Sequence, residues 1–223
     1  MEHERPPVDE EVRSALAASG MEDLGGAERL KLRDFVAEVS LWAGRIHLVG
    51  KARRAENIRM QLLDSLLLLA AAERAAPEAF EAPGARLADI GSGAGFPGVV
   101  WKIARPRIEA VFFERRRKPH IFLERAIALL DLSGARASGE DAAAHPEAGS
   151  FGLAVSKAAG RLREMLPLAE MLLAPGGLYV TIKGASWEKE LGPAVPGAMN
   201  FTGAVELPFD RGHALFFKRR GGG

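Results

Sequence analysis

Apolar residues recur at helical spacing over the first third of the chain. This spacing predicts three helices, over residues 9–18, 27–43 and 56–75. Residues 45–50, between the second and third helices, are predicted to form a loop. A stretch rich in proline and alanine, residues 77–84, interrupts the helical pattern. It is predicted to mark the boundary between these helices and the rest of the chain.

From residue 86 onward, short apolar runs alternate with segments of helical spacing. The runs predict strands over 86–90, 108–113, 135–138, 151–156 and 178–183, with helices over 97–104, 118–130 and 162–173. Residues 204–218 are predicted to form two more strands, which turn at 210–212. Such alternation is typical of a mostly parallel sheet with helices on both faces and a ligand at the carboxyl ends of the strands. We therefore expect an α/β domain over 81–220, with a helical extension over 1–80 that packs on it as part of one globular unit.

The first predicted strand runs into a turn in which glycine occupies every second position. Asp89 stands near the end of the strand, Gly91, Gly93 and Gly95 follow, and Pro97 suits the first turn of the next helix. Backbone N–H groups and the positive end of that helix can then face a ligand. The pattern predicts a site for a nucleotide-like ligand at this turn.

Two acidic residues favour S-adenosylmethionine as that ligand. Asp89 can face a cationic group, and Glu114, at the end of the second strand, can accept hydrogen bonds from both ribose hydroxyls. S-adenosylmethionine carries an amino group, a sulfonium and a ribose but no phosphate, so it suits an acidic pocket. Gly93, Gly95 and Gly98 also match the dinucleotide pattern G-x-G-x-x-G, so NAD stays open, as does a tight turn that binds nothing.

Composition narrows the possible compartments and partners. A chain of 223 residues that is 48% hydrophobic can bury a full core. Its net charge is only +1, so affinity for a nucleic acid must come from local patches. The absence of cysteine excludes disulfides, thiolate zinc sites and cysteine nucleophiles, and it is consistent with a cytoplasmic protein. The chain begins with an acidic, proline-containing segment unlike a signal peptide, and its longest apolar run is too short to span a bilayer. We therefore expect no membrane partner.

The residues around the glycine turn resemble a known family. Asp89 to Gly98 is similar to the glycine motif of the RsmG/GidB family, in which the Gly-Phe-Pro-Gly continuation at 95–98 is the more specific part. The resemblance runs over most of the chain and includes the segments 42–49, 63–66, 156–158 and 183–184. The family consists of bacterial 16S ribosomal RNA methyltransferases that methylate N7 of one guanine with S-adenosylmethionine. It implies a class I, Rossmann-like methyltransferase fold with a seven-stranded, mostly parallel sheet.

The resemblance also implies roles for particular residues and partners. Glu114 falls at the ribose-binding acid of the family, and Glu140 and Asp141 fall at its acidic turn near adenine. The expected cofactor site consists of Asp89, Gly91, Gly93, Gly95, Phe96, Glu114, Glu140 and Asp141. The expected partner is 16S rRNA in the small ribosomal subunit, and the expected state of the chain is a monomer.

Methyl transfer to guanine N7 makes modest chemical demands on a protein. N7 carries a free lone pair, so an in-line displacement at the methyl group needs alignment but no general base. We therefore expect no catalytic histidine or acid pair, and the five histidines lack metal-ligand spacing. Lys157 and Lys183, at the ends of neighbouring strands, are predicted to position the substrate, although salt-bridged strand ends are the structural alternative.

Basic residues form two groups that are predicted to bind RNA phosphates. The first consists of Arg45, Arg53 and Arg54, and the second of Arg115, Arg116 and Arg117. Charge runs of this kind also occur as ordinary solvated surface.

Two alternatives to this function remain open. Gly139 and Lys157 stand where the family commonly has arginine, and lysine lacks the planar pair of donors that grips a phosphate or a guanine edge. The chain could therefore be a class I methyltransferase for another substrate. It could also be an RNA-binding relative with weakened catalysis.

Overall fold

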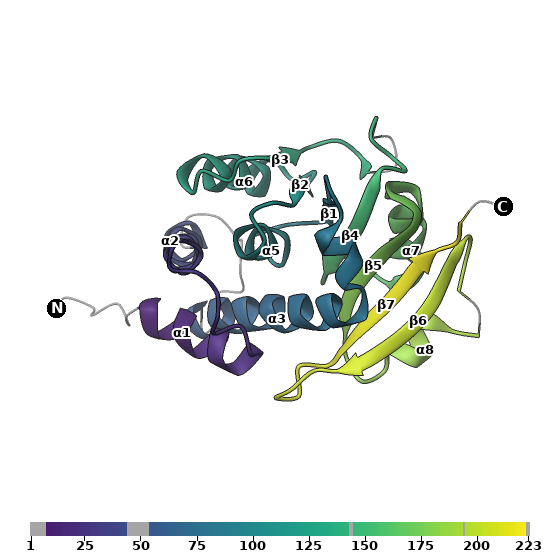
Figure 1. Ribbon diagram of the computed structural model, residues 1–223, viewed down its shortest axis with the longest axis horizontal. Helices are drawn as coiled ribbons and strands as arrows, with labels where there is room; N and C mark the ends of the chain where they lie inside the picture. Colours follow the sequence, from purple (N-terminus) through teal and green to yellow (C-terminus); the bar gives the residue numbers. More distant parts are fainter. Residues whose placement is uncertain (1–7, 44–53, 143–144, 194, 222–223) are drawn as a thin grey trace.

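The first part of the chain is helical, as the spacing of its apolar residues predicts. The computed structural model describes residues 8–43, 54–142, 145–193 and 195–221 (Figure 1). Its first helices are α1 (Val8–Ser19), α2 (Gly26–Ala43) and α3 (Arg54–Ala75). The loop predicted at 45–50 lies outside the described residues. The predicted boundary contains a short helix, α4 (Pro77–Glu81), which has Pro77 in its first turn where proline is tolerated.

The centre of the molecule is a seven-stranded sheet in the order β3-β2-β1-β4-β5-β7-β6. Its strands are β1 (Arg86–Ile90), β2 (Glu109–Phe113), β3 (Ala135–Ser138), β4 (Phe151–Lys157), β5 (Leu173–Lys183), β6 (Met199–Glu206) and β7 (His213–Arg219). The first five strands are parallel, and β7 pairs antiparallel with both β5 and β6. The prediction of a mostly parallel α/β sheet is therefore confirmed.

The sheet differs from the prediction mainly in its last third. Strand β5 begins at Leu173 rather than at residue 178, because Leu173 pairs with Phe151 before the register shifts to Leu153 and Leu178. Strand β6 begins at Met199 rather than at residue 204, and it pairs with β7 along its whole length. A short helix, α8 (Trp187–Leu191), was not predicted, since five residues are too few to show a helical period.

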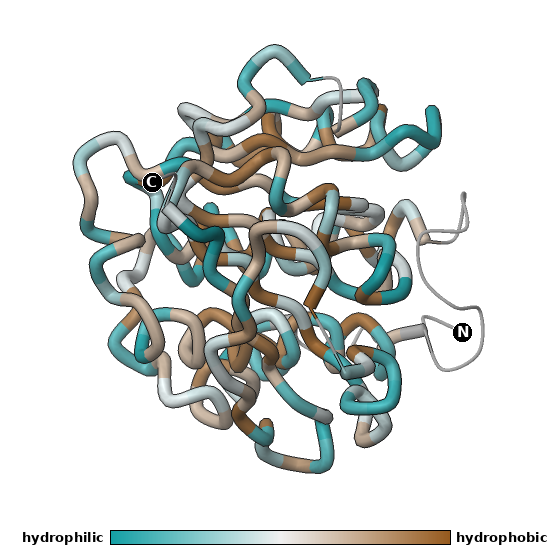
Figure 2. The backbone as a smooth tube through the Cα atoms, turned by 90° about the vertical axis from the view of Figure 1, so that its right-hand side faces the viewer, coloured by the Kyte–Doolittle hydropathy of each residue, from teal (hydrophilic) through white to brown (hydrophobic). Residues whose placement is uncertain are grey.

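Helices cover both faces of the sheet (Figure 1). The remaining ones are α5 (Gly98–Ala104), α6 (Arg117–Leu129) and α7 (Leu162–Leu172). One core cluster joins one face of the sheet to α1, α2, α3, α5 and α6, and a second joins the other face to α7. Alternate strand residues divide between them, so Leu87 and Val155 belong to the first cluster and Ala88 and Ala154 to the second. Figure 2 shows the corresponding hydrophobic segments in the middle of the molecule.

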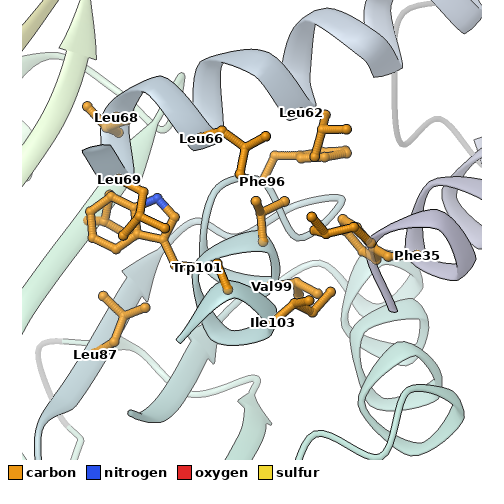
Figure 3. Packing of buried hydrophobic residues seen from close by; sticks show 14 of the residues in the cluster. Phe35, Leu62, Leu66, Leu68, Leu69, Leu87, Phe96, Val99, Trp101 and Ile103 are labelled. Atoms are coloured by element: carbon orange, nitrogen blue, oxygen red, sulfur yellow. The ribbon is translucent and has the colours of Figure 1, made fainter. Parts of the chain in front are cut away.

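The N-terminal helices share their core with the sheet. Trp101 of α5 is fully buried, and its indole N–H donates a hydrogen bond to the carbonyl oxygen of Ser65 in α3 at 2.9 Å. In Figure 3 its ring lies beside Leu69 of α3 and Leu87 of β1. A core that spans α3, α5 and β1 is consistent with one integrated unit, while the domain boundary near residue 80 stays a prediction. Among the helices of the described part, none is long and apolar enough to cross a membrane.

Helix α5 begins directly against the end of β1. The backbone N–H of Gly98 donates a hydrogen bond to Oδ2 of Asp89 at 3.1 Å. A Cβ atom at residue 98 would lie 2.6 Å from the Cβ of Asp89, closer than side chains pack. The helix can therefore approach the strand this closely only with glycine at residue 98.

We predict that Gly98→Ala lowers the free energy of unfolding by about 1–3 kcal/mol, because the added methyl group overpacks the contact with Asp89. Urea denaturation followed by circular dichroism measures the change. Gly26→Ala is the matched control, since a Cβ at residue 26 would meet no atom within 4 Å. Equal stability of the Gly98→Ala variant and the parent protein would contradict this account of the α5 start.

Candidate active site

A pocket of about 470 Å³ lies at the carboxyl ends of β1, β2, β3 and β4. This is where an open α/β sheet binds its ligand, and the volume falls in the range of about 300–1,000 Å³ that is usual for small-molecule sites. Its apolar wall is formed by Ile90, Phe113, Ala142, Ala159, Met165 and Leu168. Its charged residues are Glu114, Arg115, Arg116, Glu140 and Asp141.

Glu114, which is predicted to bind a ribose, follows the end of β2 and lines this pocket. Its side chain is 5% exposed, and Oε2 accepts a hydrogen bond from the backbone N–H of Gly93 at 3.0 Å. Arg116 donates to both carboxylate oxygens, from Nε at 3.0 Å and from Nη2 at 3.0 Å. Burial alone would raise the pKa of Glu114, but the hydrogen bonds from Arg116 and Gly93 outweigh it and lower the pKa. The carboxylate is therefore held charged.

The other two predicted acids, Glu140 and Asp141, line the pocket just after β3. At the mouth of the pocket, Nη1 of Arg115 lies 3.7 Å from Oδ2 of Asp141, and both side chains are largely exposed. From the sequence, Arg115 and Arg116 are predicted to bind RNA, and Glu114, Glu140 and Asp141 are predicted to bind the cofactor. The structure brings the two sets together, so each arginine faces an acid in one pocket.

The glycine turn supports the pocket more than it lines it. Gly91 lies in the pocket wall, and a Cβ on it would come within 2.9 Å of the Cβ of Ala159. Gly93 contributes its N–H to Glu114. Gly95 packs against Val99 and Phe35, and Phe96 is 5% exposed with its ring 5.1 Å from that of Phe35. Of the predicted glycines and Phe96, only Gly91 is among the lining residues of the described pocket.

Asp89, predicted to face a cationic ligand, is not among the described residues that line the pocket. It is fully buried, its Oδ2 accepts from Gly98, and its Oδ1 has no hydrogen-bond partner among the described residues. Burial raises the pKa of Asp89 to about 7, against the opposing effects of its hydrogen bonds and of Lys157 nearby. In this arrangement the carboxyl group joins β1 to the start of α5.

Lys157, predicted to position the substrate, is also buried at the end of β4. Its Nζ donates to the carbonyl oxygen of Gln61 at 3.2 Å, lies 3.9 Å from Oδ2 of Asp64 and stands 5.4 Å from the ring centre of Phe96. Burial lowers the pKa of Lys157 to about 8, although the carboxylates of Asp64 and Asp89 oppose this effect. The lysine therefore connects the sheet edge to α3.

Arg211 belongs to the same charged cluster and was not predicted as a site residue. Its guanidinium donates two hydrogen bonds to Asp64, from Nε at 2.6 Å and from Nη2 at 2.9 Å. Asp64 and Arg211 are 147 residues apart in the sequence. The sequence shows residues 210–212 only as a turn, and it contains no signal that pairs this turn with α3.

Lys183, the second predicted substrate residue, is engaged within the fold. Its Nζ donates to the carbonyl oxygen of Gly160 at 2.7 Å and to Glu190 of α8 at 2.8 Å. Glu190 also accepts a hydrogen bond from the backbone N–H of Leu162 at 2.6 Å, at the start of α7. This is the salt-bridged strand end that the sequence left open as the structural alternative.

The remaining predicted RNA-binding residues are only partly described. Arg45 and Arg53 lie outside the described residues, and Arg54 opens α3 with a side chain that is also outside them. Arg117 is exposed at the first position of α6. Within the described ranges, no cluster of three or more histidines and carboxylates is placed to hold a metal ion.

The chemistry of the pocket suits a ligand with hydroxyl groups, an apolar face and positive charge. Carboxylates accept hydrogen bonds and attract cations, while the apolar wall offers a surface for a flat ring. The three acids and two arginines leave the pocket with one net negative charge, which favours a cation over a phosphate.

A family model and individual relatives both match this chain and point to the same protein family. The family model described as rRNA small subunit methyltransferase G matches residues 28–210. A protein of Sorangium cellulosum (strain So ce56) named Ribosomal RNA small subunit methyltransferase G is 34% identical over 182 residues, which cover 80% of this chain and 73% of that protein. The protein of the same name from Acidiphilium cryptum (strain JF-5) is 35% identical over 170 residues, 74% of this chain and 73% of its own length.

Solved structures share the fold at low sequence identity. A methyltransferase from Geobacter sulfurreducens superimposes with a TM-score of 0.52 and 13% identity, over 84% of this chain and 88% of its own. The Escherichia coli protein yhhF superimposes with a TM-score of 0.54 and 18% identity, over 70% of this chain and 87% of its own. Together with the strand order, these similarities confirm the predicted class I methyltransferase fold.

The buried carboxyl group of Asp89 predicts a specific dependence of stability on pH. Its pKa rises from about 4 in the unfolded chain to about 7 in the folded protein. The folded state therefore binds the proton more tightly, and the contribution of Asp89 to stability falls as the pH rises through this window. Asp89→Asn keeps an acceptor for the Gly98 N–H but has no charge to bury.

We predict that the free energy of unfolding of the Asp89→Asn variant, minus that of the parent protein, increases by about 1–3 kcal/mol between about pH 4.5 and about pH 7.5. Urea denaturation at several pH values measures this difference, in which the other carboxyl groups cancel. Glu109→Gln, which removes a carboxyl group whose side chain is 61% exposed, is the control for the loss of one acid at the surface. A flat difference for Asp89→Asn would show that Asp89 titrates normally.

Proposed function

The chain belongs to the rRNA small subunit methyltransferase G family, and from this premise we propose that it transfers a methyl group from S-adenosylmethionine to N7 of a guanine in 16S rRNA. The single observation that carries the cofactor assignment is the placement of Glu114. A buried, charged carboxylate forms the pocket wall at the end of β2, where it can accept hydrogen bonds from two ribose hydroxyls.

The other pocket residues fit the proposed cofactor. Glu140 and Asp141 stand at the side where the resemblance puts adenine, and the apolar wall formed by Phe113, Met165 and their neighbours suits a flat base. The three acids outnumber the two arginines of the pocket, and this net negative charge favours a cofactor with a sulfonium and an amino group over NAD, which carries a pyrophosphate. Gly91 and Ala159 both line the pocket, and a Cβ at residue 91 would lie 2.9 Å from the Cβ of Ala159.

The reaction requires positioning by the protein and no proton transfer before attack. When bound, S-adenosylmethionine supplies a methyl group on a positively charged sulfur, which leaves as a neutral thioether. The lone pair of guanine N7 would form the new N–C bond as the S–C bond breaks, and the positive charge would pass from the sulfur to the methylated base, so no side chain would have to act as a general base. The residues of the chain have to bind the RNA, align N7 with the methyl group and exclude water.

The substrate side of the site is proposed to consist of basic residues around the pocket. Arg115 and Arg116 at the mouth, and Arg117 next to them, can bind RNA phosphates once they leave their acidic partners. Lys157 is proposed to act through Asp64 and Arg211, as a positioning residue on the substrate side. The proposal keeps the chain as a cytoplasmic monomer whose partner is the small ribosomal subunit.

The burial of Lys157 and the engagement of Lys183 within the fold favour a second candidate, a class I methyltransferase that acts on another substrate. Both proposals share the cofactor and differ in the methyl acceptor.

The proposed function is tested by methyl transfer from radiolabelled S-adenosylmethionine. We expect incorporation into small ribosomal subunits or 16S rRNA that lack the modification, and mapping should locate the label at N7 of one guanine. Heat-denatured protein is the control. Incorporation into small molecules but not into rRNA would favour the second candidate, and calorimetry that shows no affinity for S-adenosylmethionine would contradict both.

The hydrogen bonds from Arg116 to Glu114 predict competition with the cofactor. The ribose hydroxyls need the same carboxylate oxygens that the guanidinium occupies, so binding has to displace Arg116. The Arg116 side chain is 67% exposed, which limits the strength of the pair. We predict that Arg116→Ala tightens the binding of S-adenosylmethionine about two- to fivefold, equivalent to about 0.5–1 kcal/mol.

Calorimetry at low and high salt measures this effect. The parent protein should gain affinity as salt weakens the pair, whereas the Arg116→Ala variant should gain less. Arg117→Ala is the matched control with unchanged affinity, and Glu114→Gln should weaken binding about tenfold or more, because the charge-assisted hydrogen bonds are lost. Weaker binding by the Arg116→Ala variant would mean that Arg116 instead holds Glu114 in its binding position.

A further inference from the structure

The turn between β6 and β7, residues 207–212, lies at the same edge of the sheet as the pocket. His213, the first residue of β7, pairs with Lys183 at the carboxyl end of β5, and β5 is parallel to β4, which ends at Lys157. In Figure 1 this turn lies beside α3, at the end of the long hairpin. The hairpin therefore extends the ligand edge of the sheet beyond the cofactor pocket.

This turn is anchored on both sides. Arg211 donates two hydrogen bonds to Asp64 of α3, and the backbone N–H of Leu207 donates to the carbonyl oxygen of Gly212 at 2.7 Å. Leu207 is buried, and any side chain at residue 212 would collide with the carbonyl oxygen of Lys183. Anchors at both ends hold the intervening residues in one conformation.

The tip of the turn has an unfavourable backbone conformation. Phe209 has φ of 62° and Asp210 has φ of 54°, in the left-handed region that residues other than glycine and asparagine rarely adopt. For a bulky residue such as phenylalanine this is a true outlier. Strained residues of this kind gather at ligand-binding and catalytic sites, where the surrounding structure holds them in place.

The conformation presents the ring of Phe209 to solvent. Every aromatic residue of the chain lies in the described part, and Phe209 alone among them is exposed, with 62% of its surface accessible. All the others pack inside the protein or against its surface, including Phe201 and Phe217 of the same hairpin. A rigid turn that holds one aromatic ring outward is a suitable platform for a flat partner.

We propose that Phe209 stacks on an unpaired base of the substrate RNA. This inference rests on the proposed function, which brings RNA to this edge of the sheet. Single-stranded RNA is recognised largely by stacking of splayed bases on aromatic side chains. Phe209 is a single exposed ring, preceded by Pro208 and followed by Asp210 and Arg211, so it offers one flat face to a base and no broad apolar patch to a protein surface. Phe209 is then a positioning residue for the RNA and has no contact with the cofactor.

Substitutions of Phe209 separate stacking from general effects. Phe209→Ala should raise the KM for small ribosomal subunits about 10- to 100-fold, the range expected for loss of one stacked base. Phe209→Trp should keep KM within about twofold, and Phe209→Leu should resemble Phe209→Ala, because leucine is apolar but has no flat face. Asparagine suits the left-handed backbone, so Phe209→Asn removes the ring without disturbing the turn. It should raise the KM for small ribosomal subunits as much as Phe209→Ala does.

Two controls accompany these variants. The affinity for S-adenosylmethionine, measured by calorimetry, should stay unchanged in all of them. Val205→Ala removes an apolar side chain that is 44% exposed on the same hairpin, and it should leave KM unaltered. If the Phe209→Leu variant matched the parent protein, or the Phe209→Ala variant kept its KM, the stacking proposal would be wrong while the methyltransferase proposal stood.

A binding experiment tests stacking without turnover. A single-stranded RNA oligonucleotide that contains 2-aminopurine loses fluorescence when its base stacks on an aromatic ring. The parent protein and the Phe209→Trp variant should quench this fluorescence, and the Phe209→Ala and Phe209→Asn variants should quench it much less. Equal quenching by all four proteins would overturn the proposal even if methyl transfer to rRNA were demonstrated.

Discussion

The contact between the carboxyl group of Asp89 and the first backbone N–H of α5 determines the geometry on which the rest of the structure depends. It joins the end of β1 to the start of a helix at a distance that only glycine at residue 98 permits. Helix α5 then carries Trp101 into the core, where the indole binds the backbone of α3 (Figure 3). Helix α3 in turn holds Asp64, which fixes Arg211 in the β6–β7 turn. The buried junction at Asp89 and Gly98 is therefore linked, through α5 and α3, to the β6–β7 turn at the far edge of the sheet.

Charge in this protein is arranged in local pairs. The net charge is +1, yet the pocket mouth contains acidic and basic residues in direct contact. Arg116 binds Glu114, and Arg115 faces Asp141. The pair with Arg116 lowers the pKa of Glu114 and holds that carboxylate charged, and both pairs shield the acids from the RNA that we propose as substrate. Exchange of an arginine between an acid and a phosphate offers a physical link between occupancy of the pocket and binding of RNA.

Interior charges behave differently from those at the mouth. Asp89 and Lys157 are both buried, and burial moves the pKa of each toward neutrality, to about 7 and about 8. Removal of either Asp89 or Lys157 would leave its buried polar partners without compensation. Both side chains therefore help to hold the carboxyl ends of β1 and β4 in place. Lys157 also bridges Gln61 and Asp64 of α3, so the helical cover and the strand end are held together near the pocket.

By itself the sequence determined the fold class, most element bounds and the acids of the pocket. Periodicity identified the helices and strands, and the order of elements identified Glu114, because parallel strands place their carboxyl ends at one edge. Glu140 and Asp141 were indicated by the resemblance to the RsmG/GidB family. Tertiary structure alone decided which of these groups meet. It buried Asp89 against the start of α5, buried Lys157, bound Lys183 to Glu190 and paired Arg211 with Asp64 across 147 residues. Such contacts depend on the side-chain directions and the distances between elements in the folded chain, and the order of residues does not encode them locally.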